Sequence, residues 1–303
     1  SASFGVSKYL VHLLAIHSPH LSSMNSTGDL FVFNTSEKKE SPRSSARVAS
    51  PNLMLANGEF DIRDGGNGIE VWVTQMGEYM NMNTGWIDRA SGTVAIIDPF
   101  DSTRWVEALA AEGLRPTHLL YTHTHRDHTA GYDEMKKLVP DVEVWAHREA
   151  VSGDYLNNYV FGEIAADSEW INPANSTVKW SAGGITLGIT HSPGHAPGHV
   201  TIHGYGVYHA GDLLFTAASG RVDLAGSDPT AQWFSVLFAR GLLRALPANW
   251  RLIPGHRYDW VDGSTPDWVS LEQALAYNYA LNAKELELFE QLPFQRFDDD
   301  IAN

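Results

Sequence analysis

The segment YTHTHRDH, at residues 121–128, places three histidines and an aspartate within six residues. It follows the run HLL at residues 118–120, whose leucines are typical of a strand, so the histidines stand where a strand ends and a loop begins. If the backbone stays extended through Thr124, His123 and His125 face the same side, as two ligands of one metal ion would. The segment therefore predicts a metal site at a strand end.

Two further side chains of this segment point to a second metal ion. Asp127 and His128 follow with the turn of the loop and supply a carboxylate and a nitrogen beside the first pair. A polar surface turn with solvated histidines is the alternative interpretation for any one of these residues. Four potential ligands at this spacing favour a metal site, which requires further ligands later in the chain.

Three later segments each place a potential ligand directly after an expected strand, namely HSPGHAPGH at 191–199, AGD at 210–212 and PGH at 254–256. The Pro-Gly pairs force tight turns that hold His195 and His256 in defined places. Gly211 permits a close approach of the backbone beside the carboxylate of Asp212. A single histidine at a strand end is usually structural, but this ordered set indicates a metal site.

The composition restricts both the metal ligands and the partners. The 303 residues include no cysteine, so disulfides are excluded and any metal is held by histidines and carboxylates. The formal net charge of −15 opposes binding to nucleic acid and to anionic lipid. Hydrophobic residues make up 43% of the chain, which suffices for a buried core, and no apolar run predicts a membrane span. We expect a soluble protein with a small-molecule substrate, and the cytoplasm is slightly favoured as its location.

Residues 1–55 differ from the rest and are expected to form an N-terminal extension. Its charged, Ser-rich stretch at 36–45 is typical of a linker or a long surface loop. Apolar positions in residues 9–16 predict a short amphipathic helix that docks on the domain or on a second subunit, which would make a homo-oligomer. The same stretch resembles the core of a secretion signal but lacks a clear small-residue cleavage site, so processing of the N-terminus stays open.

Residues 56–303 are expected to form one catalytic domain with a C-terminal helix. The pattern predicts strands at 69–75, 80–87, 94–98, 118–121, 142–146, 185–190, 200–203, 207–210 and 252–253, and helices at 101–112, 132–138, 229–246 and 268–290. Strands and helices alternate in two halves, which indicates two sheets with helices outside. Residues 148–177 predict an irregular insertion near the site, whose aromatic side chains line a substrate pocket or pack against the domain.

From about residue 69 to residue 260, these segments resemble the metallo-β-lactamase superfamily. The resemblance implies an α/β fold, a four-layer αβ/βα sandwich with the metal site at the top edge of two facing sheets. It implies a first metal ion held by His123, His125 and His195, a second held by Asp127, His128 and His256, and Asp212 as the bridge between them. The remaining histidines of the domain are expected to support ligands or to pack, namely those at 118, 147, 191, 199, 203 and 209.

Nitrogen and carboxylate ligands suit Zn²⁺ and accept Fe²⁺ or Mn²⁺ equally. Two cations beside one water lower its pKa toward about 7 and polarise a carbonyl, so hydrolysis is the expected reaction. Asp127 can orient the hydroxide and help to return a proton, which makes it the candidate catalytic residue. The chain is therefore predicted to be a binuclear metallohydrolase that acts on a small ester, thioester or lactone.

The runs VAIIDP at 94–99, GRVD at 220–223 and GHRY at 255–258 resemble the glyoxalase II and persulfide dioxygenase branch of the superfamily. Glyoxalase II has a long helical C-terminal domain with basic residues that grip the glutathione carboxylates. Here the chain after His256 is short, and Lys284 and Arg296 are the basic residues that follow Arg257. This departure counts against glutathione thioesters as substrates.

Other interpretations stay open. A persulfide dioxygenase binds one iron through the positions that match His123, His195 and Asp212, and its shorter C-terminal region fits this chain. A quorum-quenching lactonase would carry a tyrosine where this chain has Phe215. True β-lactamases generally lack the bridging aspartate, and the nucleic-acid-processing branch needs an inserted domain. A non-enzymatic metal-binding protein is the alternative from another class, but its site tends to be closed by protein ligands.

Overall fold

The computed structural model describes residues 54–292 and contains two β-sheets. The first has the order β1 (Phe60–Asp64), β2 (Ile69–Met76), β3 (Asn81–Asp88), β4 (Thr93–Ile97), β5 (His118–Leu120), β6 (Glu143–His147) and β7 (Ser168–Trp170). The second has the order β13 (Val269–Ser270), β12 (Arg251–Pro254), β11 (Val207–Gly211), β10 (Val200–Gly204), β9 (Ile185–His191) and β8 (Ser176–Ala182). The helix expected at 9–16 and the stretch at 36–45 lie outside the described residues.

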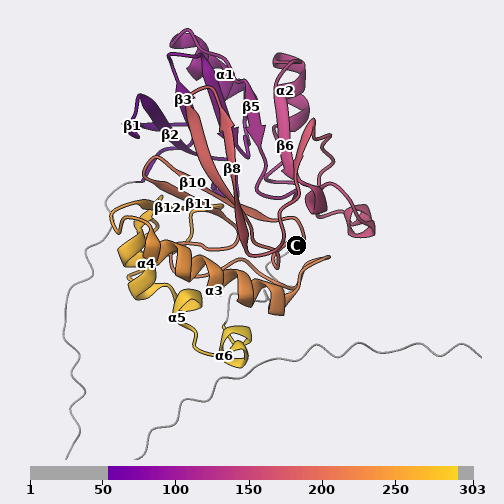
Figure 1. Ribbon diagram of the computed structural model, residues 1–303, viewed down its shortest axis with the longest axis vertical. Helices are drawn as coiled ribbons and strands as arrows, with labels where there is room; N and C mark the ends of the chain where they lie inside the picture. The colour runs from indigo at the N-terminus through magenta and orange to yellow at the C-terminus, as the bar shows by residue number, and fades with distance from the viewer. Residues whose placement is uncertain (1–53, 293–303) are drawn as a thin grey trace, which may run out of the picture. The chain divides into compact units, whose positions relative to one another are not determined.

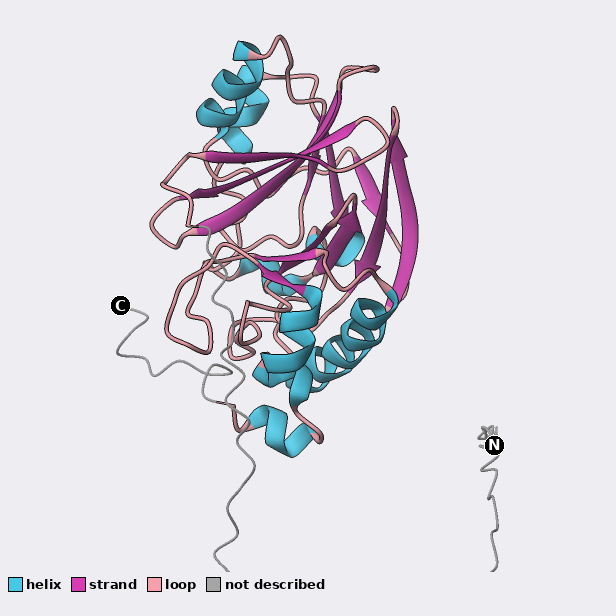
Figure 2. Cartoon of the chain, turned by 90° about the vertical axis from the view of Figure 1, so that its left-hand side faces the viewer, coloured by secondary structure: helices cyan, strands magenta, loops and turns pink. Residues whose placement is uncertain are grey.

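Helices cover the outer face of each sheet. The first sheet carries α1 (Ser102–Ala111) and α2 (Tyr132–Leu138), and the second carries α3 (Pro229–Ala245), α4 (Leu271–Tyr277), α5 (Tyr279–Asn282) and α6 (Leu286–Glu290). Figure 1 shows the two helical layers on opposite sides of the strands, and Figure 2 shows the sheets between them from a second direction. This order of helices, sheet, sheet and helices confirms the expected four-layer αβ/βα sandwich.

The layers follow from the alternation of side chains along the central strands. In β4, Ala95 and Ile97 contact the core between the sheets, whereas Val94 and Ile96 contact the core under α1 and α2. All four side chains are fully buried. A strand buried on both faces has a continuous apolar sequence, as this one has. Complete burial of an aliphatic side chain of this kind contributes about 1.5–3 kcal/mol to stability, so each sheet is held from both sides.

Most expected elements are confirmed to within two residues. Asp101 is the N-cap of α1, because its side chain accepts a hydrogen bond from the Arg104 amide. The structure adds β1, β7 and β8, which the sequence pattern did not predict. In β8 most side chains are exposed or half-buried, and Trp180 is the buried one, so the strand lacks the apolar alternation that would mark it.

The single helix expected at 268–290 is wrong. The chain forms β13, α4, α5 and α6 there instead. Ser270 caps a new helix by accepting a hydrogen bond from the Gln273 amide. Asn278 then leaves the helical conformation at φ −64° and ψ 124°, and its side-chain amide donates to the main-chain oxygens of Phe215 and Ala218 at 2.9 and 2.8 Å. These long-range bonds break the helix at a position that local sequence does not mark.

Main-chain hydrogen bonds join the two sheets at one edge. The Val200 amide at the start of β10 donates to the Thr122 oxygen, just after β5, at 2.8 Å. The Met82 amide in β3 donates to the Gly255 oxygen, just after β12, also at 2.8 Å. The segments that carry the predicted ligands after β5, β9, β11 and β12 therefore meet at this edge.

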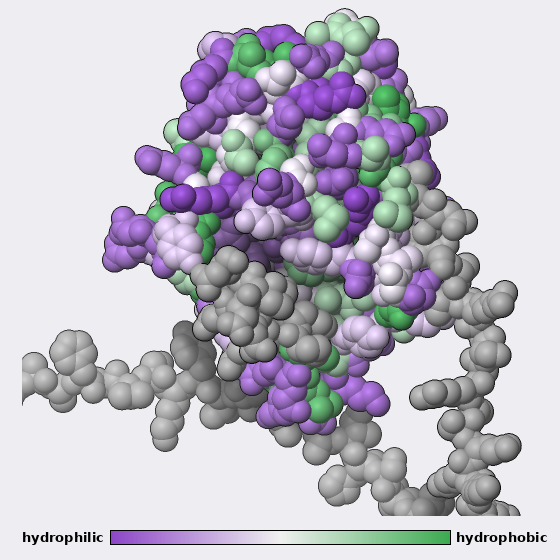
Figure 3. All heavy atoms as spheres, turned by 180° about the vertical axis from the view of Figure 1, so that it is seen from behind, coloured by the Kyte–Doolittle hydropathy of each residue, from purple (hydrophilic) through white to green (hydrophobic). Residues whose placement is uncertain are grey.

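On the face seen in Figure 3, hydrophilic residues predominate and hydrophobic residues form separate small groups. Within residues 54–292, each helix is too short or too polar to cross a membrane.

Asn278→Ala should lower the free energy of unfolding by about 3 kcal/mol, because buried main-chain oxygens lose their donor and α5 loses its N-cap. Urea unfolding followed by tryptophan fluorescence measures this loss. The matched control is Asn282→Ala, whose side-chain amide is exposed and donates to the Asn278 oxygen at 2.8 Å. It should cost about 1 kcal/mol or less. Equal losses in both variants would contradict the assigned role of Asn278.

Candidate metal centre

The candidate ligands lie on short loops that glycines allow to approach closely. Gly211, the last residue of β11, has φ +50°, and a Cβ there would lie 2.6 Å from His199 Nε2. A Cβ at Gly255 would lie 2.0 Å from Asp212 Oδ1, so any larger residue would displace that carboxylate. The close approach predicted for Gly211 is confirmed, and Gly255 provides a second one.

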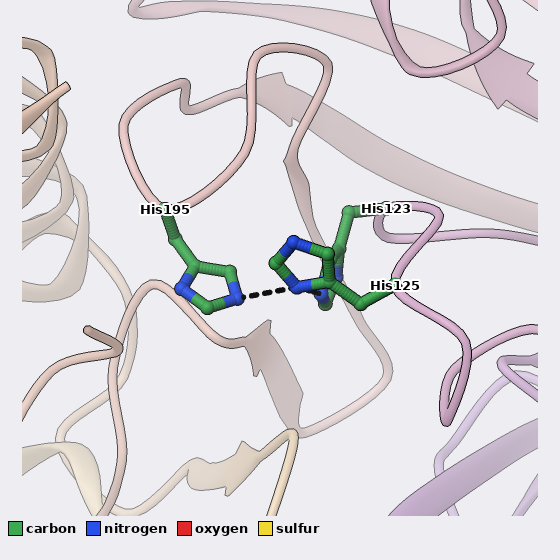
Figure 4. A group of neighbouring side chains, drawn as sticks. All are labelled: His123, His125 and His195. Carbon is green, nitrogen blue, oxygen red and sulfur yellow. Dashed lines mark hydrogen bonds between the residues drawn. The ribbon is translucent and has the colours of Figure 1, made fainter. Parts of the chain in front are cut away.

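Three buried histidines form the first group. His125 Nδ1 lies 3.0 Å from His123 Nε2 and 2.9 Å from His195 Nε2. Figure 4 shows the three rings directed toward one another, with His123 and His125 on the segment after β5 and His195 on the loop after β9. One ring nitrogen has either one hydrogen or one lone pair, so His125 Nδ1 cannot serve both neighbours in ordinary hydrogen bonds. Converging imidazole nitrogens of this kind suit a cation.

A carboxylate and two histidines form the second group. His256 Nε2 lies 3.1 Å from Asp127 Oδ2 and 3.3 Å from His128 Nε2. His128 Nε2 lies 3.5 Å from the same Asp127 oxygen. The two histidines are buried, whereas 23% of the Asp127 side chain is exposed. Asp127 is thus the member of this group that solvent or a substrate can reach.

Asp212 lies between the two groups. Its Oδ2 is 3.4 Å from His195 Nε2 of the first group and 3.5 Å from His256 Nε2 of the second. Its Oδ1 is 3.4 Å from His128 Nε2, yet this buried oxygen has no hydrogen-bond partner. Buried carboxylate oxygens are normally paired, so an oxygen without a partner among imidazoles fits a shared cation.

Burial determines the charge of the first group. It lowers the pKa of His123 and of His125 well below the usual range, and the charge of neighbouring histidines adds to this effect. Burial also lowers the pKa of His195, although Asp212 opposes it. These rings are therefore neutral, which is the form that binds metal.

Carboxylates determine the charge of the second group. Burial alone would lower the pKa of His128, but Asp127 and Asp212 outweigh it and raise that pKa to about 10. Burial would raise the pKa of Asp212, yet His256 and His128 hold it well below its ordinary value. His128 therefore has to lose a proton before it can bind a cation.

Polar groups hold the second nitrogen of several rings. Asp98 Oδ2 lies 2.9 Å from His128 Nδ1, and Asp98 Oδ1 accepts from the Thr122 amide at 2.8 Å. The main-chain oxygens of Arg221 and Tyr79 lie 2.7 Å from His195 Nδ1 and 2.8 Å from His256 Nδ1. Such partners orient a ring toward a metal.

The sequence analysis missed Asp98 as a site residue, although it noted the run VAIIDP. Asp98 has a φ of +43°, in the left-handed region that non-glycine residues rarely adopt. The sequence does not reveal this conformation. The structure shows it in a buried aspartate directly after β4, which marks Asp98 as a site residue.

His199 contacts Asp212 and lies outside the two ligand groups. Its Nε2 accepts a hydrogen bond from the Asp212 amide at 3.0 Å, and its Nδ1 lies 2.9 Å from Ser192 Oγ. Burial lowers the pKa of His199 well below its usual range, which keeps the ring neutral and able to accept. The expected supporting role of His199 is consistent with this geometry.

The other histidines lie outside the two groups. His147 and His191 stack with ring centroids 3.7 Å apart, and both rings contact the main-chain oxygen of Asn172. His209 Nδ1 lies 3.0 Å from Thr84 Oγ1 between the sheets, and His118 Nδ1 lies 2.8 Å from Thr117 Oγ1. These contacts are compatible with the expected packing role, and His147 and His191 also converge with Glu149 as a third group that could hold an ion.

Aromatic side chains flank both groups. Phe161, from the expected insertion, has its ring centroid 4.9 Å from that of His125, and Tyr155 contacts Phe161 edge-on at 5.0 Å. On the other side, Tyr258 stacks on His256 at 5.4 Å. Trp170, from the same range 148–177, packs in the core between the sheets. Packing, one of the two alternatives for these aromatic residues, therefore holds for Trp170.

The sequence matches the family model of the metallo-beta-lactamase superfamily over residues 81–256, which include every candidate ligand. The chain belongs to this superfamily. It is 28% identical over 137 residues to a hydroxyacylglutathione hydrolase of Aeromonas salmonicida, covering 45% of this chain and 48% of the relative. It is 30% identical over 213 residues to a hydroxyacylglutathione hydrolase of Rhodopseudomonas palustris, covering 67% of this chain and 76% of the relative.

A solved structure shows the same fold. ETHE1 from Myxococcus xanthus superposes with a TM-score of 0.57 at 21% identity, covering 72% of this chain and 87% of that protein. The chain spans about half the length of the first curated relatives it matches. The superfamily implies divalent metal ions, and the two groups of histidine and aspartate side chains fit them.

Asp98→Asn should weaken zinc binding by about 10–100-fold at one of two positions, because His128 loses the carboxylate that orients it. Isothermal titration of metal-free protein with zinc measures both affinities. Asp101→Asn, which changes an exposed carboxylate that caps α1, serves as the control and should bind as the unchanged protein does. Unaltered zinc affinity in the Asp98 variant would remove Asp98 from the support of the centre.

Proposed function

We propose that the chain is a hydrolase that uses two divalent metal ions to cleave a small ester, thioester or lactone. The observation that carries this proposal is the position of Asp212, whose two oxygens face both ligand groups. In the proposal, His123, His125 and His195 hold the first ion, Asp127, His128 and His256 hold the second, and Asp212 bridges them.

The donor set supports zinc at both positions, with iron or manganese as alternatives that accept the same ligands. When bound, two such ions lower the pKa of a shared water toward about 7 and polarise a carbonyl. A structural metal site is normally closed off by its protein ligands, whereas 23% of the Asp127 side chain in the second group is exposed to solvent. This arrangement favours an enzyme over a non-enzymatic metal-binding protein.

Asp127 is proposed as the catalytic residue. Its Oδ2 accepts a hydrogen bond from Asn81 Nδ2 at 2.9 Å, which leaves its direction well defined. Its partial exposure lets it reach a substrate from within the centre. A carboxylate held in this way can orient the attacking hydroxide and later deliver a proton to the leaving group.

The names of the relatives support a thioester substrate, but the contacts of this chain do not favour glutathione. After His256, the described basic residues are Arg257 and Lys284. Arg257 is buried and pairs with Asp267 at 3.1 Å, so its charge is already used within the fold. Two substrate carboxylates would therefore find little positive charge in this part of the domain.

A mononuclear iron persulfide dioxygenase is the alternative. The likeness to ETHE1 is compatible with it, although at 21% identity that likeness concerns the fold. The convergence of Asp127, His128 and His256 favours the hydrolase, because one iron held through the positions of His123, His195 and Asp212 does not require this second group.

His195→Ala should lose most of the metal bound to the first group and reduce activity by several orders of magnitude, because one of three ligands is removed. Metal analysis after purification and gel filtration provides the measurement. His118→Ala is the matched control. His118 stands at the start of β5, whereas the candidate ligands follow its end, and the His118 ring contacts Thr117. Full metal content in both variants would refute the ligand assignment.

Anaerobic hydrolysis separates the two candidate reactions. The zinc- or manganese-loaded protein should cleave a generic thioester or lactone without oxygen, since hydrolysis involves no oxidant. Thioester, lactone and glutathione persulfide should be assayed side by side in an oxygen electrode. The dioxygenase would be established instead if the iron-loaded protein alone consumed oxygen with glutathione persulfide and if no form of the protein cleaved the thioester or the lactone.

A further inference from the structure

The insertion after β6 is bonded directly to the histidine segment that follows β5. The Gly162 amide donates to the Thr124 oxygen at 2.8 Å, and the Arg126 amide donates to the Val160 oxygen at 3.0 Å. These bonds lie on the two sides of His125. A Cβ at Gly162 would lie 2.0 Å from Thr129 Oγ1, so the insertion approaches the segment as closely as its backbone permits. Its position relative to the proposed first metal is therefore fixed.

A pocket of about 760 Å³ lies between the insertion, the histidine segment and the start of α2. We call it the insertion pocket, and its walls include Thr124, Arg126, Tyr132, Leu156, Phe161 and Ile164. Its volume lies within the range of about 300–1,000 Å³ that is usual for small-molecule sites. No metal ligand lines it, so it is separate from the centre described above.

Phe161 connects the insertion pocket with the metal centre. Phe161 lines the pocket, and its ring packs against His125 with ring centroids 4.9 Å apart. The pocket thus begins one side chain away from the first ligand group. A substrate that reaches from the metal centre into this space would have to pass Phe161.

The charges of the pocket select against an acidic ligand. Asp133 and Glu163 both line it, against one cationic side chain, that of Arg126. Arg126 Nε already donates to the Phe161 oxygen at 3.2 Å. A carboxylate of the ligand would meet more negative than positive charge, in a chain whose net charge is −15. Leu156, Ile164 and the aromatic rings offer contacts to an uncharged apolar group instead.

We propose that the insertion pocket holds the acyl group of an uncharged thioester or ester, and that Leu156 and Phe161 limit the size of that group. This inference rests on the hydrolase proposed above and names its substrate class. It assigns a specificity role to an insertion that carries none of the candidate metal ligands.

The test uses the full chain loaded with zinc and three thioesters of N-acetylcysteamine, which share one uncharged leaving group. Their acyl groups are acetyl, phenylacetyl and succinyl. We expect kcat/KM for phenylacetyl to exceed that for acetyl by at least about tenfold, and succinyl to be the poorest. Leu156→Trp fills the pocket and should lower kcat/KM for phenylacetyl by about tenfold or more, while acetyl changes less than about twofold.

Two further variants keep the test decisive. Leu138→Trp, on α2 but outside the pocket and 47% exposed, should leave all three rates unchanged. Leu156→Ala enlarges the pocket. It should raise kcat/KM for a fourth thioester of N-acetylcysteamine, with a naphthylacetyl group, relative to that for phenylacetyl. This second variant keeps the test valid if the tryptophan variant misfolds. Metal content should equal that of the unchanged protein in every variant.

Several results would overturn the inference. Equal rates with acetyl and phenylacetyl, preference for succinyl, or an equal loss on both neutral substrates in Leu156→Trp would each remove the pocket from substrate recognition while the hydrolase stands. An unchanged protein that cleaves no thioester, ester or lactone would refute both proposals.

Discussion

The buried carboxylate of Asp212 is the group on which the arrangement of the centre depends. It faces His195, His128 and His256 at 3.4–3.5 Å, so it attracts side chains from both ligand groups into one small volume. The neutral ring of His199 accepts a hydrogen bond from the Asp212 amide, and the absence of a side chain at Gly255 leaves room for the Asp212 carboxylate. A buried charge of this kind is costly unless it is compensated, which explains why so many polar groups converge there.

The two-sheet fold is what makes that compensation possible. His128 follows a strand of the first sheet, whereas Asp212 and His256 follow strands of the second. Neither half holds a complete candidate group together with Asp212. Packing of the two sheets through their common core, and the hydrogen bond from Val200 to Thr122 at the edge, set the distance between the halves. The positions of the candidate ligands are thus a product of core packing as much as of their own loops.

Local sequence was sufficient wherever a short range of residues determines the outcome. The alternation of buried side chains in β4, the N-cap of α1 at Asp101 and the Pro-Gly turn before His195 each depend on a few adjacent residues. The candidate ligands stand in short motifs of the same kind, so the sequence was enough to list them. The break at Asn278 could not be predicted, because its cause is a pair of oxygens about sixty residues earlier. Asp98 was missed for a related reason, since its partner His128 is thirty residues away and its unusual backbone conformation leaves no mark on composition.

The contacts of Asn278 also bear on how the domain is bounded. The part matched to the superfamily ends at residue 256, yet the loop that follows Asp212 finds its hydrogen-bond donor in the segment between α4 and α5. The segment after residue 256 therefore helps to hold the main chain at Phe215. The ring of Phe215 packs against Tyr258 beside the centre. A fragment cut to the superfamily match alone would lose Asn278, and with it the donor that holds the loop after Asp212.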